Sequence, residues 1–179
     1  MSTPTQRSDL IDAASSTAPV GERDLRTALG QFATGVTVVT ALGPSGEPVG
    51  LTVSSFNSVS LAPPLVLWSL GCQSRALDAF RACSHYAINV LAANQLPWAL
   101  QFAARDVDRF ASVRWTPGLD GVPLLEGTLA TFECINRSQY PAGDHIIFVG
   151  EVRACRHTNT LAPLLYHRGK LLDDSRLDT

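Results

Sequence analysis

The feature of this sequence that most constrains its fold is a series of extended segments that follow one another without regular helical spacers. Residues 35–42 (GVTVVTAL) form a β-branched run. The turn residues 44–46 (PSG) separate it from a second extended run over residues 49–60. Two such runs around a turn predict a β-hairpin. The folded part of the chain therefore begins with antiparallel pairing, which favours a mostly antiparallel sheet.

Further strands and three short helices are expected along the rest of the chain. The remaining strands are predicted over residues 65–70, 85–91, 128–136 and 145–156, the last two joined through residues 140–144. Helical spacing of apolar residues occurs over residues 22–33, 74–82 and 95–104, and residues 106–121 have the composition of a loop. Ser74 is the expected N-cap of the second helix. A C-terminal segment containing residues 164–170 follows the last strand.

This order of elements favours a β-barrel class over an alternating α/β fold. Neither G-x-G-x-x-G after a strand nor G-x-x-x-x-G-K-[ST] occurs, so the two common nucleotide-binding folds are not indicated. A mostly β structure with some α, an antiparallel barrel flanked by short helices, is predicted instead. Residues 1–21 are small and polar and predict a flexible N-terminal tail. The domain is expected over residues 22–172, with a C-terminal tail over residues 173–179.

Charge, hydropathy and cysteine usage limit the classes of function. The formal net charge is -2, which excludes the broad basic surface of a nucleic-acid-binding protein but still allows a local phosphate pocket. No apolar run approaches the ~20 residues of a membrane span, and no signal peptide is evident, so a cytoplasmic protein without membrane contact is expected. Cys72, Cys83, Cys134 and Cys155 form no C-x-x-C pair and have no histidine at ligand spacing, which predicts reduced thiols and no metal site.

Two polar segments could meet a phosphate-bearing ligand. Residues 50–60 (GLTVSSFNSVS) carry hydroxyl and amide groups on a strand, where small side chains let a ligand approach the backbone. Ser74 and Arg75 at a helix start could bind an anion. Each segment also has an ordinary structural interpretation, since residues 50–60 suit a solvent-facing strand and Ser74 suits simple capping beside a solvated Arg75.

Two further segments carry an imidazole. His145 opens the apolar strand 146–150 and could contact a ligand at a barrel mouth, or simply close a turn. Residues 166–170 (YHRGK) could hold a dinucleotide by stacking and charge, or could lie in solvent. Taken from the residues alone, the prediction is a barrel-like domain with a candidate phosphate pocket.

Six segments, in order, resemble the short-chain flavin reductases, the FMN-binding split-barrel proteins that serve two-component flavin-dependent monooxygenases. The segments are residues 32–40 (FATGVTVVT), 50–60 with 63–65, 87–91 (AINVL), 108–110 (DRF), 142–151 (AGDHIIFVGE) and 163–169 (PLLYHRG). The resemblance implies a split antiparallel β-barrel, a homodimer and hydride transfer from NADH or NADPH to FMN or FAD. It also implies that the reduced flavin leaves for a partner monooxygenase component.

The resemblance also implies which residues form the site. The implied flavin contacts are Thr34, Gly35, Val36, Thr37, Thr52, Val53, Ser54, Ser55, Phe56, Asn89, Val90 and Phe102, with Ser74 and Arg75 at the phosphate end. His145 matches the position that meets the nicotinamide, where it would position the ring or manage a proton. The implied pyridine-nucleotide contacts are Tyr166, His167, Arg168 and Gly169.

Two alternatives remain open at this point. The same barrel could serve a pyridoxamine-phosphate-oxidase-like or deazaflavin-dependent enzyme, or it could store flavin without catalysis. The first is disfavoured by residues 142–151 and the second by the presence of His145 and residues 166–169. The choice between FMN and FAD, and between NADH and NADPH, is not determined by these segments.

Overall fold

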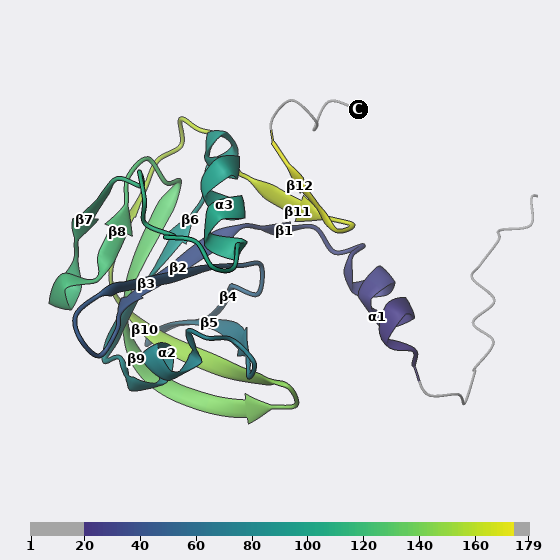
Figure 1. The fold of residues 1–179 in the computed structure, drawn as a ribbon, viewed down its shortest axis with the longest axis horizontal. Helices are drawn as coiled ribbons and strands as arrows, with labels where there is room; N and C mark the ends of the chain where they lie inside the picture. Colours follow the sequence, from purple (N-terminus) through teal and green to yellow (C-terminus); the bar gives the residue numbers. More distant parts are fainter. Residues whose placement is uncertain (1–19, 174–179) are drawn as a thin grey trace, which may run out of the picture.

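A computed structural model of the protein describes residues 20–173. The tails expected at residues 1–21 and 173–179 lie almost entirely outside the described residues. Within residues 20–173, β-strands dominate and helices are short (Figure 1), which confirms the predicted fold class. No helix in the described range is long and apolar enough to cross a membrane.

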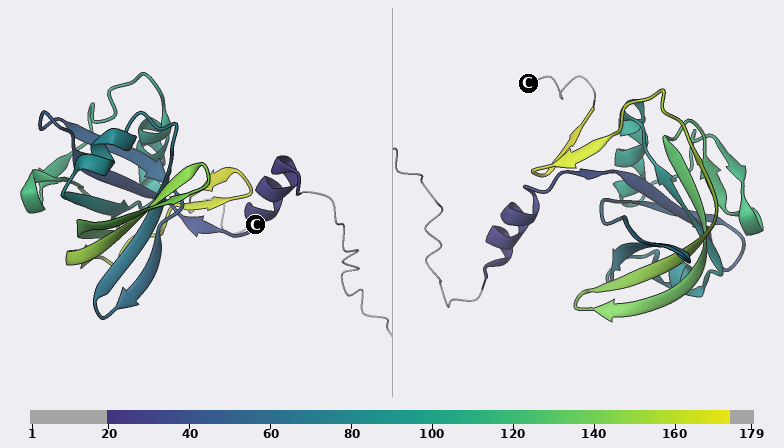
Figure 2. Two further views of the ribbon diagram at one scale, coloured as in Figure 1. Left: turned by 90° about the horizontal axis from the view of Figure 1, so that it is seen from below. Right: turned by 180° about the vertical axis from the view of Figure 1, so that it is seen from behind.

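Seven strands form one antiparallel sheet in the order β3-β2-β6-β9-β10-β5-β4. Their bounds are β2 Thr37–Leu42, β3 Pro48–Val53, β4 Asn57–Leu61, β5 Pro64–Gly71, β6 His85–Val90, β9 Ala130–Ala142 and β10 His145–His157. Strand β9 extends six residues beyond the predicted end at Asn136, because residues 138–142 pair with the start of β10. Figures 1 and 2 show the sheet strongly curved.

The predicted single strand over residues 49–60 is wrong: the chain divides it between the two edges of the sheet. Strands β3 and β4 are consecutive in sequence but lie at opposite ends of the strand order. Only residues 54–56 join them, and such a link spans at most about 14 Å. The sheet must therefore curl until its two edges approach each other, which is the split barrel that the resemblance implied.

An aromatic core fills the inside of the curled sheet. Trp68 of β5 stacks on Phe148 of β10 with ring centroids 4.7 Å apart, and Phe80 and Tyr86 meet Trp68 edge-on. All four side chains are buried. Phe80 comes from helix α2 (Leu77–Ala82), and its contacts with the Trp68 and Phe148 rings hold this helix against the sheet.

A second apolar cluster lies under helix α3 (Leu96–Ala103). It contains Phe102 of α3 together with Val36, Val38, Leu91 and Leu164. Gly50 of β3 is needed beneath this helix, because a Cβ there would lie 2.8 Å from the Phe102 ring. Close packing on Gly50 therefore fixes α3 over β3.

Smaller elements complete the fold. Strands β1 (Thr34–Gly35), β11 (Leu165–His167) and β12 (Lys170–Leu172) form a three-stranded sheet, and β7 (Trp115–Pro117) pairs with β8 (Pro123–Leu125). The short 3₁₀ helices are η1 (Ala93–Gln95) and η2 (Leu119–Gly121). The prediction of a loop over residues 106–121 was therefore wrong at β7, whose three residues are too few for a pattern of alternation to reveal.

Helix α1 (Glu22–Leu29) stands away from the body of the domain (Figures 1 and 2). It ends four residues before the predicted boundary at Ala33. None of its residues is buried, and the apolar side chains Leu25, Leu29 and, just beyond the helix, Phe32 are 47%, 64% and 73% exposed. The spacing of its apolar residues predicted the helix, but the described part of the chain provides no surface that covers this face.

Candidate functional site

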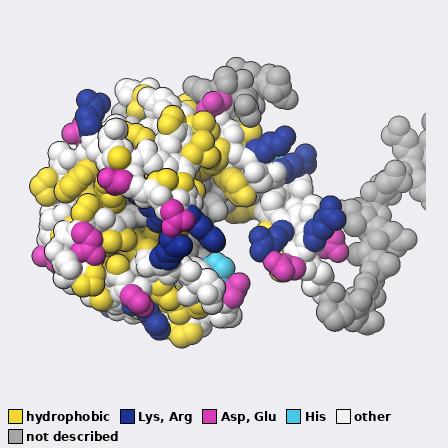
Figure 3. Space-filling model, viewed as in Figure 1, with side chains coloured by type: hydrophobic (Ala, Val, Ile, Leu, Met, Phe, Trp, Pro, Cys, Tyr) yellow, Lys and Arg dark blue, Asp and Glu magenta, His cyan; other side chains and the backbone are white. Residues whose placement is uncertain are grey.

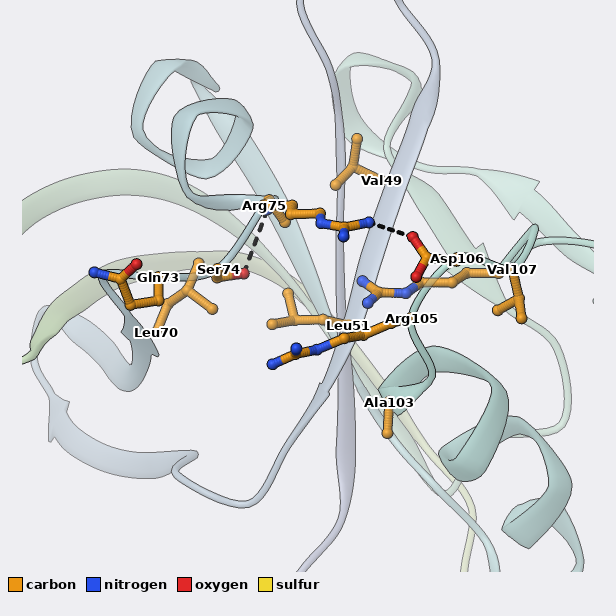
Figure 4. Close-up of a pocket in the computed structure, with 12 residues that line it drawn as sticks. Val49, Leu51, Leu70, Gln73, Ser74, Arg75, Ala103, Arg105, Asp106 and Val107 are labelled. Carbon is orange, nitrogen blue, oxygen red and sulfur yellow. Dashed lines mark hydrogen bonds and ion pairs between the residues drawn. The ribbon is translucent and has the colours of Figure 1, made fainter.

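A cavity of about 820 Å³ lies between β3, the turn before α2 and the segment that follows α3 (Figure 4). Val49, Leu51 and Leu70 contribute apolar side chains to its wall. The rest of the wall carries three arginines and one aspartate, with Gln73 and Ser74 beside them, and three small or apolar residues, Ala76, Ala103 and Val107. Figure 3 shows dark blue side chains gathered around a hollow on this face. An apolar wall beside clustered cations suits a ligand with a flat ring and an anionic group.

Arg75 and Asp106 form an ion pair across this cavity (Figure 4). The Arg75 guanidinium, through its hydrogen bond and its charge, holds the pKa of the Asp106 carboxyl below its usual range. The carboxylate therefore stays ionised at neutral pH. Arg105 lines the same cavity and makes no hydrogen bond or ion pair with any described residue.

Arg109 anchors the segment after α3. Its guanidinium donates to the carbonyl oxygen of Ala104 through Nε (3.1 Å) and Nη2 (2.9 Å), and to that of Gly50 through Nη1 (2.9 Å). Partial burial, followed by the charge of Arg75, lowers the pKa of Arg109. The side chain therefore ties α3 to β3 and adds positive potential to the cavity.

Ser74 is not the N-cap of α2, contrary to the sequence prediction. The helix starts at Leu77, and Ala76 occupies the N-cap position without a side-chain cap. Ser74 instead belongs to the preceding turn, where its Oγ accepts a hydrogen bond from the Ala76 N–H at 3.3 Å. The turn places Ser74 and Arg75 together on the cavity wall.

A second hollow, of about 620 Å³, lies beside α1 and the small sheet. It brings together the predicted residues Thr34, Ser54, Tyr166, Arg168 and Gly169. The Thr34 hydroxyl is buried and has no hydrogen-bond partner among the described residues. Such an orphaned group costs free energy unless a ligand or solvent satisfies it. This observation fits a polar ligand at this end of the barrel.

Residues 168 and 169 form the turn between β11 and β12. Arg168 and Gly169 have φ values of 49° and 77°, so both lie in the left-handed region. The Arg168 N–H donates to the Gly30 carbonyl at 2.9 Å, and its Nε donates to Gln31 Oε1 at 2.9 Å. The hairpin tip is thereby fixed to the end of α1, while His167 lies half-buried on β11.

His145 lies at the first position of β10, where it faces Gly71 at the end of β5. Its Nδ1 lies 2.7 Å from Asp144 Oδ1, and this interaction lowers the pKa of Asp144. The imidazole is 48% exposed. Because Cys72 N–H donates to the Asp144 carbonyl at 2.8 Å, His145 lies beside the turn that carries Ser74.

Residues 54–56, the link between β3 and β4, connect the two edges of the sheet. The Ser55 hydroxyl accepts from Ser69 N and donates to Ser69 O, both at 3.0 Å. Phe56 packs against Phe132 with ring centroids 5.4 Å apart. Ser54, between these and β3, is exposed and is the residue of the link that lines the second hollow.

Several predicted contact residues use their side chains inside the protein. Val36, Thr37, Val53, Asn89 and Phe102 are buried, and Val90 is half-buried. Thr52 Oγ1 donates to the Ala99 carbonyl at 2.7 Å, and Thr37 Oγ1 donates to Val53 O at 3.2 Å. Gly35 is exposed on β1. These side chains therefore already contact other parts of the protein, and their contacts with a ligand stay predictions.

The sequence reasoning missed Arg105, Asp106 and Arg109 as site residues. Arg109 lies in one of the matching segments, but no role was inferred for it, and residues 105–106 fall in a stretch interpreted as loop. Only the fold brings this stretch opposite Arg75. The described residues contain no group of three or more His, Cys, Asp or Glu that could hold a metal ion.

The chain matches the model of the flavin reductase-like domain over residues 29–173. It is 50% identical over 141 residues to the FMN reductase (NADH) SmoA of Agrobacterium fabrum, covering 78% of this chain and 80% of that protein. It is 38% identical over 159 residues to HsaB of Rhodococcus jostii, the reductase subunit of a flavin-dependent monooxygenase, covering 89% of this chain and 81% of the relative. Other relatives are longer, and the chain spans 47% of a flavin reductase homologue from Rhizobium meliloti.

Comparison with solved structures also finds a similar flavin oxidoreductase. The NADH:FAD oxidoreductase SgcE6 of Streptomyces globisporus, in complex with NAD and FAD fragments, superposes with a TM-score of 0.80 at 39% identity, covering 88% of this chain and 94% of that chain. The family resemblance seen in the six ordered segments is thereby confirmed. This chain belongs to the flavin reductase-like domain family.

Proposed function

We propose that this protein is an NAD(P)H:flavin oxidoreductase that reduces FMN or FAD with NADH or NADPH and supplies the reduced flavin to a separate monooxygenase. The observation that carries the proposal is the arginine-lined cavity between β3, the turn before α2 and the segment after α3, in a chain of this family. The relatives support it by name, since SmoA is an FMN reductase that uses NADH and HsaB is a monooxygenase reductase subunit.

The residues present fit a flavin nucleotide. When bound, the flavin supplies the ring that accepts the hydride, so the protein needs to provide position and charge rather than a set of acids and bases. Ser74 and Arg75 would hold the phosphate, and Val49 and Leu51 offer apolar contact nearby. The Thr34 hydroxyl, which has no hydrogen-bond partner among residues 20–173, and the exposed Ser54 would meet polar groups of the ligands at the second hollow.

His145 and the β11–β12 turn would hold the pyridine nucleotide. His145 is exposed at the strand end and can donate or accept a hydrogen bond. Tyr166 is an exposed aromatic ring that can stack, and Arg168 supplies a cation beside it. In this assignment His145 orients the nicotinamide or moves a proton, and it need not act as a base.

We also propose a homodimer in which the apolar face of α1 packs on the partner. An exposed row of Leu25, Leu29 and Phe32 is unusual for a helix that remains in water. The second hollow is lined partly by α1, so a dimer would complete its wall. We further propose that the protein works in the cytoplasm, where the exposed free thiols of Cys72 and Cys155 remain reduced.

A steady-state assay that crosses FMN and FAD with NADH and NADPH tests the proposed function. We expect oxidation of the pyridine nucleotide when free flavin is added, and reduced flavin that a monooxygenase can use. A flavin-bound protein without turnover would favour storage, and turnover with deazaflavin alone would favour the deazaflavin-dependent alternative. Either result would contradict the proposal.

A further inference from the structure

The ion pair between Arg75 and Asp106 spans the part of the cavity to which the proposed function assigns the flavin phosphate. Arg75 comes from the turn before α2 and Asp106 from the segment after α3, so the two side chains approach from opposite walls (Figure 4). Their side chains are 78% and 73% exposed. No packing therefore holds the pair together, and the carboxylate can be exchanged for another anion.

The backbone around Asp106 directs its carboxylate toward Arg75. Asp106 has a φ of 58°, in the left-handed region that is unfavourable for most residues but tolerated by Asp, Asn and Gly. The guanidinium of Arg109 anchors the flanking chain through the Ala104 and Gly50 carbonyls. The segment is thus held in place on both sides, while the Asp106 carboxylate has Arg75 as its hydrogen-bonding partner.

The charge of the wall suits an anion larger than one carboxylate. Three arginines and a single aspartate line the cavity. Arg105 has no ion-pair partner among the described residues, and Arg109 adds a partly desolvated charge. A phosphate carries more charge and more acceptor oxygens than a carboxylate, so it can take the Arg75 guanidinium from Asp106 and engage the neighbouring arginine.

We propose that Asp106 is an intramolecular competitor for the flavin phosphate. The inference rests on the proposed function, in which that phosphate binds at Ser74 and Arg75. The carboxylate leaves Arg75 when the phosphate enters and returns to it when the flavin departs. Asp106 thereby weakens the binding of flavin nucleotides, which suits a flavin that must be released to another protein. Riboflavin, which has no phosphate, is not affected by this competition.

The test measures dissociation constants for FMN and for riboflavin by flavin fluorescence, without NADH. In Asp106→Asn we expect FMN to bind about 2- to 5-fold more tightly at low salt, with the gain shrinking as salt is added. Riboflavin affinity should stay unchanged. Asp106→Gly, which also accepts the left-handed backbone, should give the same result. In an Arg75→Gln background, removal of Asp106 should have no effect on FMN.

A control variant at a second exposed carboxylate shows whether the effect is specific to Asp106. Asp78→Asn removes an exposed carboxylate from α2, three residues after Arg75, and should leave both dissociation constants unchanged. Unchanged FMN affinity in both Asp106 variants, equal tightening of riboflavin, or equal tightening in Asp78→Asn would overturn the competition. Wild-type protein that binds FMN but does not oxidise NADH would refute the proposed function alone, because the binding comparison needs no turnover. Absence of binding of both FMN and FAD to the wild type would overturn both.

Discussion

The side chain of Asn89 shows at the residue scale how burial changes an expected role. Its Nδ2 donates to Val38 O at 3.0 Å and to Thr40 Oγ1 at 3.1 Å, while its Oδ1 accepts from Leu125 N at 3.0 Å. The residue is fully buried. The amide therefore joins β6 to β2 and to β8, and this interior role competes with the predicted flavin contact.

Replacing Asn89 by alanine should lower the free energy of unfolding by about 2–4 kcal/mol, because buried partners are left unsatisfied and a small cavity forms. Urea denaturation measures this change. Asn57→Ala is the control, since the Asn57 side chain is exposed and only accepts from the adjacent Ser58 N–H. Normal stability of Asn89→Ala with weakened flavin binding would contradict the structural role and support the predicted ligand contact.

His145 differs from Asn89 because it is exposed and its imidazole interacts with the exposed Asp144 side chain. His145→Ala should raise KM for NADH about 3- to 10-fold, the worth of one or two lost hydrogen bonds, with little change in the dissociation constant of FMN. His157→Ala at the other end of β10 is the control. Unchanged steady-state kinetics in His145→Ala would remove His145 from the site.

At the scale of elements, the link between β3 and β4 decides whether the barrel holds its shape. The β4–β5 ladder reaches Asn57 opposite Leu67, and beyond it the Ser55 hydroxyl takes both backbone groups of Ser69. One side chain thus replaces a missing strand partner at the edge of β5. It does so where the chain crosses from one sheet edge to the other.

Ser55→Ala should therefore cost about 1–3 kcal/mol of unfolding free energy, since the Ser69 N–H and C=O lose their partner. Chemical denaturation provides the measurement. Ser54→Ala is a matched control, because Ser54 is exposed and should change stability by less than about 0.5 kcal/mol. Equal stability of the two variants would show that water replaces the Ser55 hydroxyl without cost.

At the scale of the whole molecule, the exposed apolar face of α1 is the feature on which the proposed homodimer rests. Phe32→Asp combined with Leu29→Asp should convert the proposed homodimer into a monomer, because charges cannot be buried at an apolar interface. Light scattering during gel filtration should then report about 19.2 kDa instead of twice that mass. Leu100→Asp on α3, also exposed, should remain dimeric. A monomeric wild type would contradict the proposal.

The sequence by itself determined the class of fold, the family and the main strands. Residues 35–42 and 145–156 were predictable as strands, since local preference and turn residues depend on neighbours along the chain. Six ordered segments identified the family, and one of them included His145, while Ser74 and Arg75 were singled out by their place at a predicted helix start. The helix at α1 was predictable for the same local reason, although its end was placed too late.

Only the tertiary structure decided which of these residues meet. The separation of β3 from β4 depends on closure of a seven-stranded sheet, and the pairing of Arg75 with Asp106 joins two segments 31 residues apart. Asn89 is buried because three strands surround it. Such contacts arise from long-range strand pairing, which local patterns do not encode because each segment would have the same pattern with another partner.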